Sequence, residues 1–470
     1  MALTKVTNRM TQGAAVSVLD YGADPTGATD SATAIQSALN DATEIFFPDG
    51  TYLIESTLTV TNSFRIFGNG SQTIIRPGSA LGATDDVIHI TPSGSEKRFC
   101  SIENISIIPE SGTPARHSIH MDLTDPNALI ANFKMEGVLT EATGGYAFYL
   151  TNPTKTDGFF ASTIVRNKLK GGIFMERAGD SINVSENLIS GSNEGIRFSS
   201  ISGASQIIID RNNITASGGA IYVEENAEQV KIRDNQIEQS QTYNGDLSSG
   251  ETACIAIIGT SGYKSQGNEI TGNNINNFGN ADYCVRLEHC EKTKLSGNVL
   301  GARTASGFET DHLLIKSSCE NIRVFRDNVF NSVDTTTDTT PRVSDSGVGT
   351  CGLLREITDL QNSWTESNPS SFGVYVYKDP ASDLIHLMGL VSGGTTTSGT
   401  VILSVPDGYT PRTWPAENTN CRFHVVGRNS SNVNVATYVT MTHDGDLQVN
   451  DVDASVYLDG ISYVGDSVFN

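Results

Sequence analysis

The chain repeats Asn167-Lys-Leu169, Asn187-Leu-Ile189 and Asn212-Asn-Ile214, and it continues this pattern of Asn, any residue and Ile, Leu or Phe up to residue 330. The further copies are Asn235-Gln-Ile237, Asn273-Asn-Ile275, Asn298-Val-Leu300 and Asn328-Val-Phe330. Successive copies begin 20 to 38 residues apart. Repeats of this length are typical of solenoid proteins, in which each unit is too small to bury its own apolar face and must stack on its neighbours.

Short alternating segments lie on both sides of the repeated Asn. Ile182-Asn-Val184 and Ile207-Ile-Ile209 precede two of the copies, and Ile196-Arg-Phe198 and Ile221-Tyr-Val223 lie between copies. Two-residue alternation places every other side chain on one face of a strand, so the Ile, Val and Leu side chains should point inward and stack from coil to coil. With two or three strands per turn and no helical segments, the repeat predicts a parallel β-helix. The repeated Asn, which lies between two strands, tolerates left-handed backbone geometry and can hydrogen-bond to the Asn of the next coil.

The composition narrows the classes of function. Charged residues make up 18% of the 470 residues, and the formal net charge is -22. Such a field repels phosphate backbones and anionic membrane surfaces, so we expect no nucleic-acid partner and no membrane insertion. It would also repel a strongly anionic polysaccharide, unless basic residues are concentrated locally. The seven cysteines have no metal-ligand spacing, and we expect buried or half-buried reduced thiols in a chain that folds in a reducing cytoplasm.

The N-terminal part carries a second set of motifs, Val18–Gly27, Thr29–Ser31, Ala34–Leu39 and Phe47–Tyr52. These motifs resemble the start of pectate-lyase-like phage β-helices, and the resemblance implies a right-handed β-helix. Thr29 or Asp30 can cap a short helix with Ile35, Ala38 and Leu39 on one face. Such a helix would cover the open end of the solenoid core and block pairing at its edge.

The pattern changes after residue 330. Residues 331–350 lack apolar periodicity and are interpreted as a linker. Short strand patterns at the spacing of a β-sandwich follow, and Ser404–Pro411 resembles a C-terminal β-sandwich of phage tail proteins, which in that family serves trimerisation or carbohydrate binding. The predicted domains are an N-terminal adaptor segment (1–17), a β-helix (18–330), the linker (331–350) and the sandwich (351–470).

The two resemblances imply a bacteriophage tailspike, a protein of the virion that folds in the host cytoplasm and acts at the bacterial surface. They imply a homotrimer that recognises and cleaves a capsule, an O-antigen or another exopolysaccharide. Other phage tail proteins would bind the N-terminus, either through the short adaptor or through a domain that a truncated sequence lacks. The N-terminal sequence has no apolar segment of a signal peptide, and no stretch is long and apolar enough to span a bilayer.

Candidate site residues follow from the strand that lies between successive Asn signals. If Ile173, Ile196, Ile221 and Val285 point inward, the residue after each of them points outward. Such residues can bind a sugar through the face of an aromatic ring or the guanidinium of an Arg. These substrate-binding candidates are Phe174, Arg197, Tyr222 and Arg286. One alternation further on lie the catalytic candidates Glu224, Glu176 and Glu288.

Glycoside hydrolysis requires two carboxyl groups, and their separation predicts the stereochemical outcome. Glu176 and Glu224 are two coils apart, as are Glu224 and Glu288, which corresponds to about 9 to 10 Å at the spacing of strands. This separation lies near the upper end of the range for inverting enzymes and well above that for retaining enzymes. The pair therefore predicts a hydrolase that inverts the anomeric configuration, with no metal and no cofactor.

Two long insertions, residues 239–252 and 301–311, should emerge on the same edge of the solenoid and flank this outer face. They add further substrate-binding candidates, which are Tyr243, Asp246, Glu251, Glu309, Asp311 and, next to them, His312. We expect His312 to be a surface or loop residue.

Three alternatives remain open at this level. A polysaccharide lyase of the same fold would use Arg197 or Arg286 to abstract the proton next to a uronate carboxylate. Such lyases hold calcium with clustered acidic residues, and the sequence has no dense Asp cluster, which favours hydrolysis. A non-enzymatic spike would only bind the receptor sugar. A bacterial or prophage enzyme that is independent of any particle would require a secretion signal.

Overall fold

The structure is a computed structural model that describes residues 15–94, 96–110, 115–141, 144–153, 158–191, 194–216, 219–239, 251–278, 281–302, 311–332, 343–348, 350–366, 373–411, 420–429, 431, 433–450 and 455–464. The chain divides into two compact units. The first contains residues 1–290, 297–314 and 329–344, and the second contains residues 291–296, 315–328 and 345–470.

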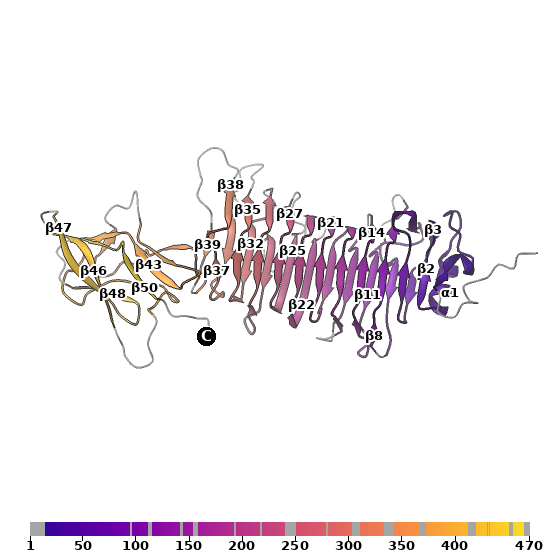
Figure 1. Cartoon of the computed structure of the whole chain (residues 1–470), viewed down its shortest axis with the longest axis horizontal. Coiled ribbons are helices and arrows are strands. Elements are labelled where there is room, and N and C mark those ends of the chain that lie inside the picture. The colour runs from indigo at the N-terminus through magenta and orange to yellow at the C-terminus, as the bar shows by residue number, and fades with distance from the viewer. Residues whose placement is uncertain are drawn as a thin grey trace, which may run out of the picture. The chain divides into compact units, whose positions relative to one another are not determined.

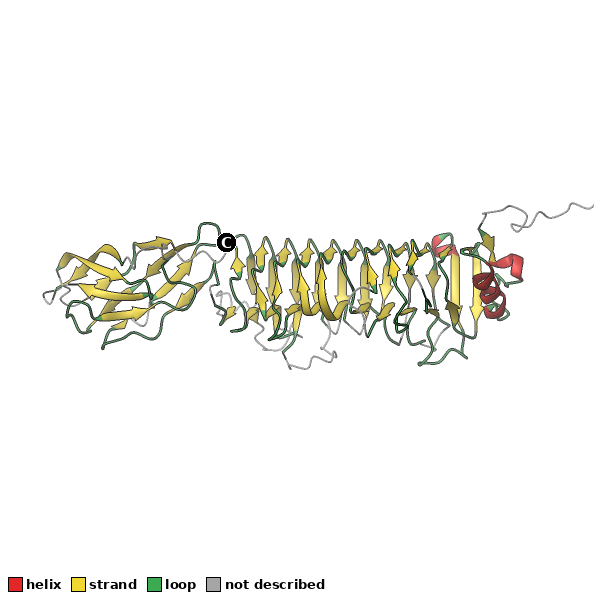
Figure 2. Ribbon diagram, turned by 90° about the horizontal axis from the view of Figure 1, so that it is seen from below, coloured by secondary structure: helices red, strands yellow, loops and turns green. Residues whose placement is uncertain are grey.

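The first unit is a stack of coils in which each coil contributes strands to three parallel sheets, here called A, B and C (Figures 1 and 2). Sheet A contains β1 (Val16–Ser17), β2 (Glu44–Phe46), β5 (Arg65–Phe67), β9 (Ser101–Glu103), β13 (Lys134–Glu136), β17 (Thr163–Val165), β20 (Asn183–Ser185), β23 (Ile208–Asp210), β26 (Lys231–Arg233) and β30 (Glu269–Thr271). Sheet B contains β3 (Gly50–Ile54), β6 (Thr73–Pro77), β10 (Ser106–Ile107), β14 (Leu139–Thr140), β18 (Lys168–Lys170), β21 (Leu188–Gly191), β24 (Asn213–Ala216), β27 (Gln236–Gln239), β31 (Asn274–Asn277), β35 (Val299–Ala302) and β38 (Val329–Ser332).

Sheet C carries the second of the alternating segments. It contains β4 (Leu58–Val60), β7 (Ile88–Ile90), β11 (Ile119–Asp122), β15 (Phe148–Thr151), β19 (Ile173–Glu176), β22 (Ile196–Ser205), β25 (Ile221–Glu228), β28 (Ala253–Ile258), β32 (Tyr283–Glu288), β36 (Asp311–Ile315) and β39 (Val343–Asp345). Short strands in the turns are β8 (Lys97–Arg98), β12 (Ile130–Ala131), β16 (Phe159–Phe160), β29 (Ser265–Gln266) and β33 (Cys290–Glu291). Three sheets of this kind form a right-handed parallel β-helix, which confirms the predicted fold class.

The core consists of three columns of apolar side chains, one for each sheet. In sheet C, Ile173, Ile196, Ile221, Ile255 and Val285 occupy equivalent positions of successive strands, and all are fully buried. Sheets A and B have equivalent columns, Ile164–Val184–Ile209–Ile232–Ile270 and Leu169–Ile189–Ile214–Ile237–Ile275–Leu300. The predicted inward stacking of like side chains is therefore confirmed, and it leaves the intervening side chains on the outer faces.

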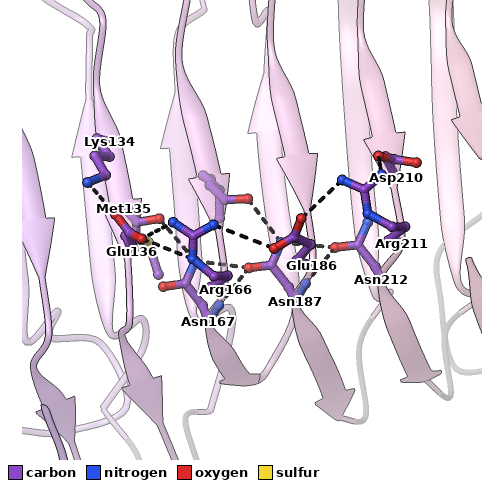
Figure 3. Close-up of polar contacts among 11 residues, drawn as sticks. Lys134, Met135, Glu136, Arg166, Asn167, Glu186, Asn187, Asp210, Arg211 and Asn212 are labelled. Carbon is purple, nitrogen blue, oxygen red and sulfur yellow. Dashed lines mark hydrogen bonds and ion pairs between the residues drawn. The ribbon is translucent and has the colours of Figure 1, made fainter.

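The repeated Asn residues form a hydrogen-bonded ladder between sheets A and B (Figure 3). The Oδ1 atom of Asn212 accepts from the backbone N–H of Asn187 at 3.0 Å and from its Nδ2 atom at 2.9 Å. The Nδ2 atom of Asn212 donates to the backbone carbonyl of Val184 and to Oδ1 of Asn235. The same contacts run from Asn167 to Asn298, so the predicted bonding between Asn side chains of adjacent coils is confirmed.

Left-handed backbone geometry falls on the residue before the repeated Asn rather than on the Asn itself. The residue before each ladder Asn has the positive φ angle, as at Arg166 (57°), Glu186 (57°), Arg211 (51°) and Asp234 (53°). The backbone N–H of each Asn donates to the side chain of the next Asn, and its carbonyl accepts from the adjacent coil, so the turn falls on the preceding residue. Because an L-residue in this region is strained, the ladder must stabilise these corners.

The corner residues carry alternating charges that contact one another on the surface (Figure 3). Arg166 forms an ion pair with Glu136 and lies 3.5 Å from Glu186, which in turn accepts from Arg211 at 3.0 Å. Each of these exposed pairs contributes about 0 to 1 kcal/mol. The alternation therefore avoids repulsion between like charges on adjacent coils and adds little stability.

The helix α1 (Ala32–Asp41) covers the N-terminal end of the stack (Figure 1), as predicted. Its buried side chains include Ile35, Ala38 and Leu39, and the carboxylate of Asp30 accepts from the backbone N–H of Ala32 at 2.9 Å. The side-chain amide of Gln36 bonds both the N–H and the carbonyl of Thr59 in β4, each at 2.8 Å. The helix therefore saturates an edge strand that could otherwise pair with another chain.

The second unit contains β34 (Lys294–Ser296) and β37 (Arg323–Val324) together with two antiparallel sheets. One sheet has the order β40 (Leu354–Glu356), β42 (Tyr375–Lys378), β43 (Leu384–Met388), β50 (Ile461–Val464). The other has the order β41 (Thr365–Glu366), β44 (Leu390–Ser392), β49 (Ser455–Tyr457), β46 (Cys421–Arg428), β47 (Asn434–Met441), β48 (Asp446–Asn450), β45 (Val401–Ser404). Side chains of both sheets share one apolar core, which fits the predicted sandwich. The domain boundaries themselves stay a prediction.

All seven cysteines are reduced thiols, six of them buried and Cys421 half-buried, as expected from the sequence. None of the helices in the described part of the chain has the length and apolar character needed to cross a membrane.

Candidate functional site

The outer face of sheet C carries a row of aromatic side chains in consecutive coils. His89, His120, Tyr149 and Phe174 occupy the same position of β7, β11, β15 and β19. The rings of His89 and His120 are stacked at 4.8 Å, and those of Tyr149 and Phe174 at 4.9 Å. His117 adds a further ring, stacked on Tyr149 at 4.2 Å. Tyr149 and Phe174 are partly exposed and stacked, so they offer an aromatic surface on which a sugar ring can lie, whereas His117 and His120 are buried beside them.

The row continues into a cluster of charged residues centred on Arg197. Register pairing places Arg197 next to Phe174, and its guanidinium lies 5.7 Å from the centre of the Phe174 ring. The Nε atom of Arg197 donates to Glu224 and its Nη1 atom donates to Glu194, both at 2.9 Å. Glu194 also accepts from the hydroxyl of Tyr146 at 2.6 Å. One guanidinium therefore holds two carboxylates in place.

Burial and ion pairing shift the pKa values of Glu224 and Arg197. Burial raises the pKa of Glu224, and Arg197 opposes this shift only in part. Burial alone would lower the pKa of Arg197, but Glu224 and Glu194 outweigh it and raise the pKa. Arg197 therefore stays protonated, whereas Glu224 has the raised pKa that suits a general acid.

A second outer row lies one alternation further along the same strands. Asp122 pairs with Thr151 and Glu176 pairs with Ser199 in this row, and Glu224 follows Val223 on β25, where the pairing with β22 shifts register. Glu176 is held by a hydrogen bond from the backbone N–H of Asn152 at 3.1 Å. A small side chain, Ser199, is paired with Glu176 on the strand next to it, which leaves room between the two carboxyl groups.

The third catalytic candidate, Glu288, has different surroundings. It is in register with Ile258, which is in register with Glu224, so an apolar side chain separates the two acids. Glu288 forms an ion pair with Arg286. The pair of Glu176 and Glu224 is therefore the better match for a sugar bound on the aromatic row.

Two predicted substrate-binding side chains point outward but are covered. Tyr222 is fully buried, and its hydroxyl exchanges hydrogen bonds with the backbone of Ala253 at 2.9 and 3.0 Å. Arg286 is 1% exposed, and it donates to the backbone carbonyl of Glu251 at 2.7 Å. The expectation that both meet the sugar directly does not fit this burial, because the segment around residues 251–253 covers them. They can act only by holding Glu251, Glu288 and that segment in place.

The loop candidates are only partly within the described residues. Tyr243, Asp246 and Glu309 lie outside them, and so does the side chain of Asp311. His312 is buried in β36, 5.7 Å from the ring of Phe330, so the expectation of a surface or loop position is wrong. Strand β36 begins at Asp311, two residues before the apolar segment Leu313–Ile315 that the sequence pattern indicates.

A second polar cluster was not found from the sequence. It consists of Asp86, Arg116 and His120, in which Arg116 binds Asp86 through two nitrogens at 3.0 and 2.6 Å. The repeated tripeptides Ile88-His89-Ile90 and Ile119-His120-Met121 were a usable signal for the histidines. Asp86, Arg116 and Glu194 lie in segments between strands, where alternation does not predict the direction of a side chain.

One atom from each of Asp86, His89 and His120 lies within 4.8 Å of the others, which is close enough to consider a metal ion. The two imidazole rings are stacked with planes 10° apart. Their in-plane lone pairs therefore do not converge on one point, and Asp86 is already neutralised by Arg116. In this arrangement Asp86 and His120 are joined by a hydrogen bond, and His89 contacts His120 by ring stacking.

The buried His117 makes the site sensitive to acid. Burial lowers the pKa of His117 to about 4, with Asp86 opposing the shift and His120 and Arg116 adding to it. Its Nδ1 atom accepts from the backbone N–H of Tyr146 at 3.0 Å, and this bond is lost on protonation.

Because the folded state binds this proton less readily than the unfolded state, we expect stability to fall as the pH drops from about 6.5 towards 4. Melting midpoints across this range should decline less in His117→Gln than in the wild type. His289→Gln, at a half-buried turn position, serves as the control with an unchanged slope. Equal slopes in wild type and His117→Gln would contradict this assignment.

Comparisons with known proteins agree with the fold. Residues 15–245 match the sequence model of a pectate-lyase-like family described as rhamnogalacturonase A/epimerase, which confirms the resemblance drawn from the N-terminal motifs. No protein with a curated description matches the chain.

Several solved structures are similar at low identity. The surface adhesin PfbA of Streptococcus pneumoniae is 16% identical, with 72% of this chain and 99% of that chain covered and a TM-score of 0.40. Tailspike protein 3 of bacteriophage CBA120 is 13% identical, with 79% and 68% covered and a TM-score of 0.38. The catalytic unit of an α-1,3-glucanase from Streptomyces thermodiastaticus is 14% identical, with 74% and 70% covered and a TM-score of 0.43. At such identities the similarity concerns the fold alone.

Proposed function

We propose that the chain is the subunit of a bacteriophage tailspike that binds a bacterial surface polysaccharide along sheet C and hydrolyses it with Glu224 and Glu176. The observation that carries the proposal is the half-buried Glu224, held by Arg197 beside the aromatic row, and its raised pKa agrees with this role. In this scheme Glu224 protonates the leaving oxygen and Glu176 activates a water on the opposite side of the sugar.

The order of the strands in sheet C supports an inverting reaction. Glu176 pairs with Ser199 on the next strand, and Glu224 lies on the strand after that. Two strand steps correspond to about 9 to 10 Å, which leaves space for a water molecule between base and sugar. Arg197 fixes Glu224, and the N–H of Asn152 fixes Glu176, so both carboxyl groups are held before the substrate binds.

The same geometry argues against elimination by Arg197. A lyase base must release its proton, but Arg197 is held between two carboxylates that raise its pKa. Those carboxylates also leave it little charge with which to neutralise a uronate. Elimination would require Arg197 to give up both ion pairs and its proton, whereas hydrolysis requires only that Glu224 take up a proton while Glu194 still pairs with Arg197.

The proposal also includes the assembly, location and partners of the protein. We infer a homotrimer in the virion, docked to other tail proteins through residues 1–17 and acting on capsule, O-antigen or exopolysaccharide. The C-terminal sandwich would serve trimerisation or carbohydrate binding.

The proposal is tested by incubating the protein with purified capsular and O-antigen polysaccharides and following polymer size and reducing ends. We expect shorter chains with new reducing ends and without the ultraviolet absorbance of a conjugated double bond. Shortening with that absorbance would mean a lyase and would overturn the assigned roles. A polymer that is bound but never shortened would favour a purely receptor-binding spike.

A further inference from the structure

Three side chains of the outer face form a relay that the proposed hydrolysis does not use. Oδ2 of Asp86 lies 2.7 Å from Nδ1 of His120, and Nε2 of His120 lies 2.9 Å from the hydroxyl of Thr151. Nδ1 also lies 3.1 Å from Nη2 of Arg116, which can only donate, and the shorter contact with Asp86 fits the neutral imidazole with its proton on Nδ1, directed at the carboxylate. The free lone pair on Nε2 then accepts the hydroxyl proton of Thr151.

The surroundings hold this order of groups in place. Asp86 and His120 are buried, at 4% and 6% exposure. Burial alone would raise the pKa of Asp86, but hydrogen bonds from His120 and Arg116 outweigh it and lower the pKa, so Asp86 stays ionised. Thr151 is the last residue of β15 and is partly exposed on the outer face. Asp86 therefore orients His120, and His120 contacts the partly exposed hydroxyl of Thr151. This arrangement of acid, base and hydroxyl activates an oxygen nucleophile.

We propose that Thr151, His120 and Asp86 form an acyl-transfer site that removes O-linked acyl groups, such as acetyl esters, from sugar hydroxyls. The ester chemistry is independent of the proposed glycan cleavage, whereas the choice of a sugar ester rests on it. Tyr149 and Phe174 lie side by side on the outer face, and Thr151 follows Tyr149 by two residues on the same strand. A sugar that lies against these two rings would therefore place an acyl group near the hydroxyl of Thr151.

The backbone beside Thr151 offers a donor for the oxyanion. The N–H of Asn152, the residue after the nucleophile, points at a carboxylate oxygen of Glu176 at 3.1 Å. An N–H at this position is a common oxyanion donor in acyl transfer. It already holds a negatively charged oxygen, and Glu176 must swing away before an ester oxygen can take its place. Glu176 is thus expected to oppose acyl transfer while it serves hydrolysis.

The reaction balances without any further reagent. The Thr151 oxygen bonds to the acyl carbon, and its proton passes to Nε2 of His120. The carbon–oxygen bond to the sugar then breaks, and the sugar oxygen takes that proton and leaves as the hydroxyl. A water molecule attacks the acyl-threonine, gives its proton to His120, and the carboxylic acid departs as Thr151 recovers its proton.

The test is hydrolysis of p-nitrophenyl acetate by the full chain, with mass spectrometry of the protein quenched during turnover. We expect several turnovers per chain and an acetyl group on Thr151. Thr151→Val should lose roughly a hundredfold or more of the rate, and Thr151→Ser should keep it. Thr163→Val, a half-exposed threonine of sheet A without a histidine partner among the described contacts, is the matched control and should keep the wild-type rate.

Glu176→Ala separates the two activities, because it should raise the rate of ester hydrolysis and abolish glycan cleavage. The relay is overturned if Thr151→Val, shown to be folded by circular dichroism, keeps the wild-type rate, or if the acetyl group maps to another residue. Absence of turnover in the wild type also overturns it. If Thr151 is acylated but no glycan is shortened, the proposed hydrolysis fails and the relay stands.

Discussion

Replacing Glu224 by Gln is expected to lower the rate of polysaccharide cleavage by about a thousandfold, because a general acid contributes roughly a hundredfold to ten-thousandfold. The amide keeps the shape of the side chain but cannot protonate the leaving oxygen. Glu194 still holds Arg197, so the cluster should stay folded and the polysaccharide should still bind. Rates are measured from reducing ends, and binding is measured separately by calorimetry with the same polymer.

Glu225→Gln is the control for this experiment. Glu225 is the next residue along β25 and is exposed, so its replacement removes one negative charge a single residue away from the site. We expect a nearly unchanged rate. Equal losses in the two variants would mean that charge, rather than proton transfer, is responsible.

The pH dependence of polysaccharide cleavage tests independently whether Glu224 is the general acid. Glu224 acts in its protonated form, and burial raises its pKa. Activity should therefore persist above the usual range of a carboxyl group and fall as the pH rises through the pKa of Glu224. This alkaline limb should be absent from the residual activity of Glu224→Gln.

Replacing Asn212 by Ala is expected to lower the free energy of unfolding by about 2 to 5 kcal/mol, since it leaves two buried donors of Asn187 without acceptors. These donors are the backbone N–H and Nδ2 of Asn187, both of which bond to Oδ1 of Asn212. The carbonyl of Val184 also loses its donor. Urea unfolding followed by circular dichroism measures the loss.

Asn213→Ala provides a matched control one residue along the chain. Asn212 is buried in the ladder, whereas Asn213 is exposed on the outer face of sheet B. We expect a change within about 0.5 kcal/mol for Asn213, as for most exposed positions. Similar losses at the two positions would show that the ladder does not stabilise the corners of the coils.

The sequence predicted the β-helix well because the alternation within strands and the repeated Asn each correspond to one structural feature. Alternation of Ile and Val with polar residues fixed which side chains of β19, β22 and β25 face the core. The repeated Asn indicated a buried ladder. The exact corner residue was missed, because Arg166 and Glu186 have no local propensity for left-handed geometry, and only their position before a ladder Asn requires it.

The candidate site was predictable only in part. Alternation correctly directed Arg197 and Glu224 outward, but it carries no information about what covers an outward side chain. Tyr222 and Arg286 were misjudged for this reason. Glu194 and Asp86 come from segments between strands, where alternation does not predict the direction of a side chain. The contact of Asp86 with His120 also depends on the stacking of two coils, whereas Glu194 is only three residues from Arg197.

The most direct test of the central claim is the anomeric configuration of the first product, followed by proton NMR during cleavage of a susceptible polysaccharide. Two carboxyl groups two strands apart predict that the new reducing end first appears with the configuration opposite to that of the cleaved bond. A first product with the retained configuration would contradict the pairing of Glu176 with Glu224, because retention requires two carboxyl groups much closer together than these strands allow.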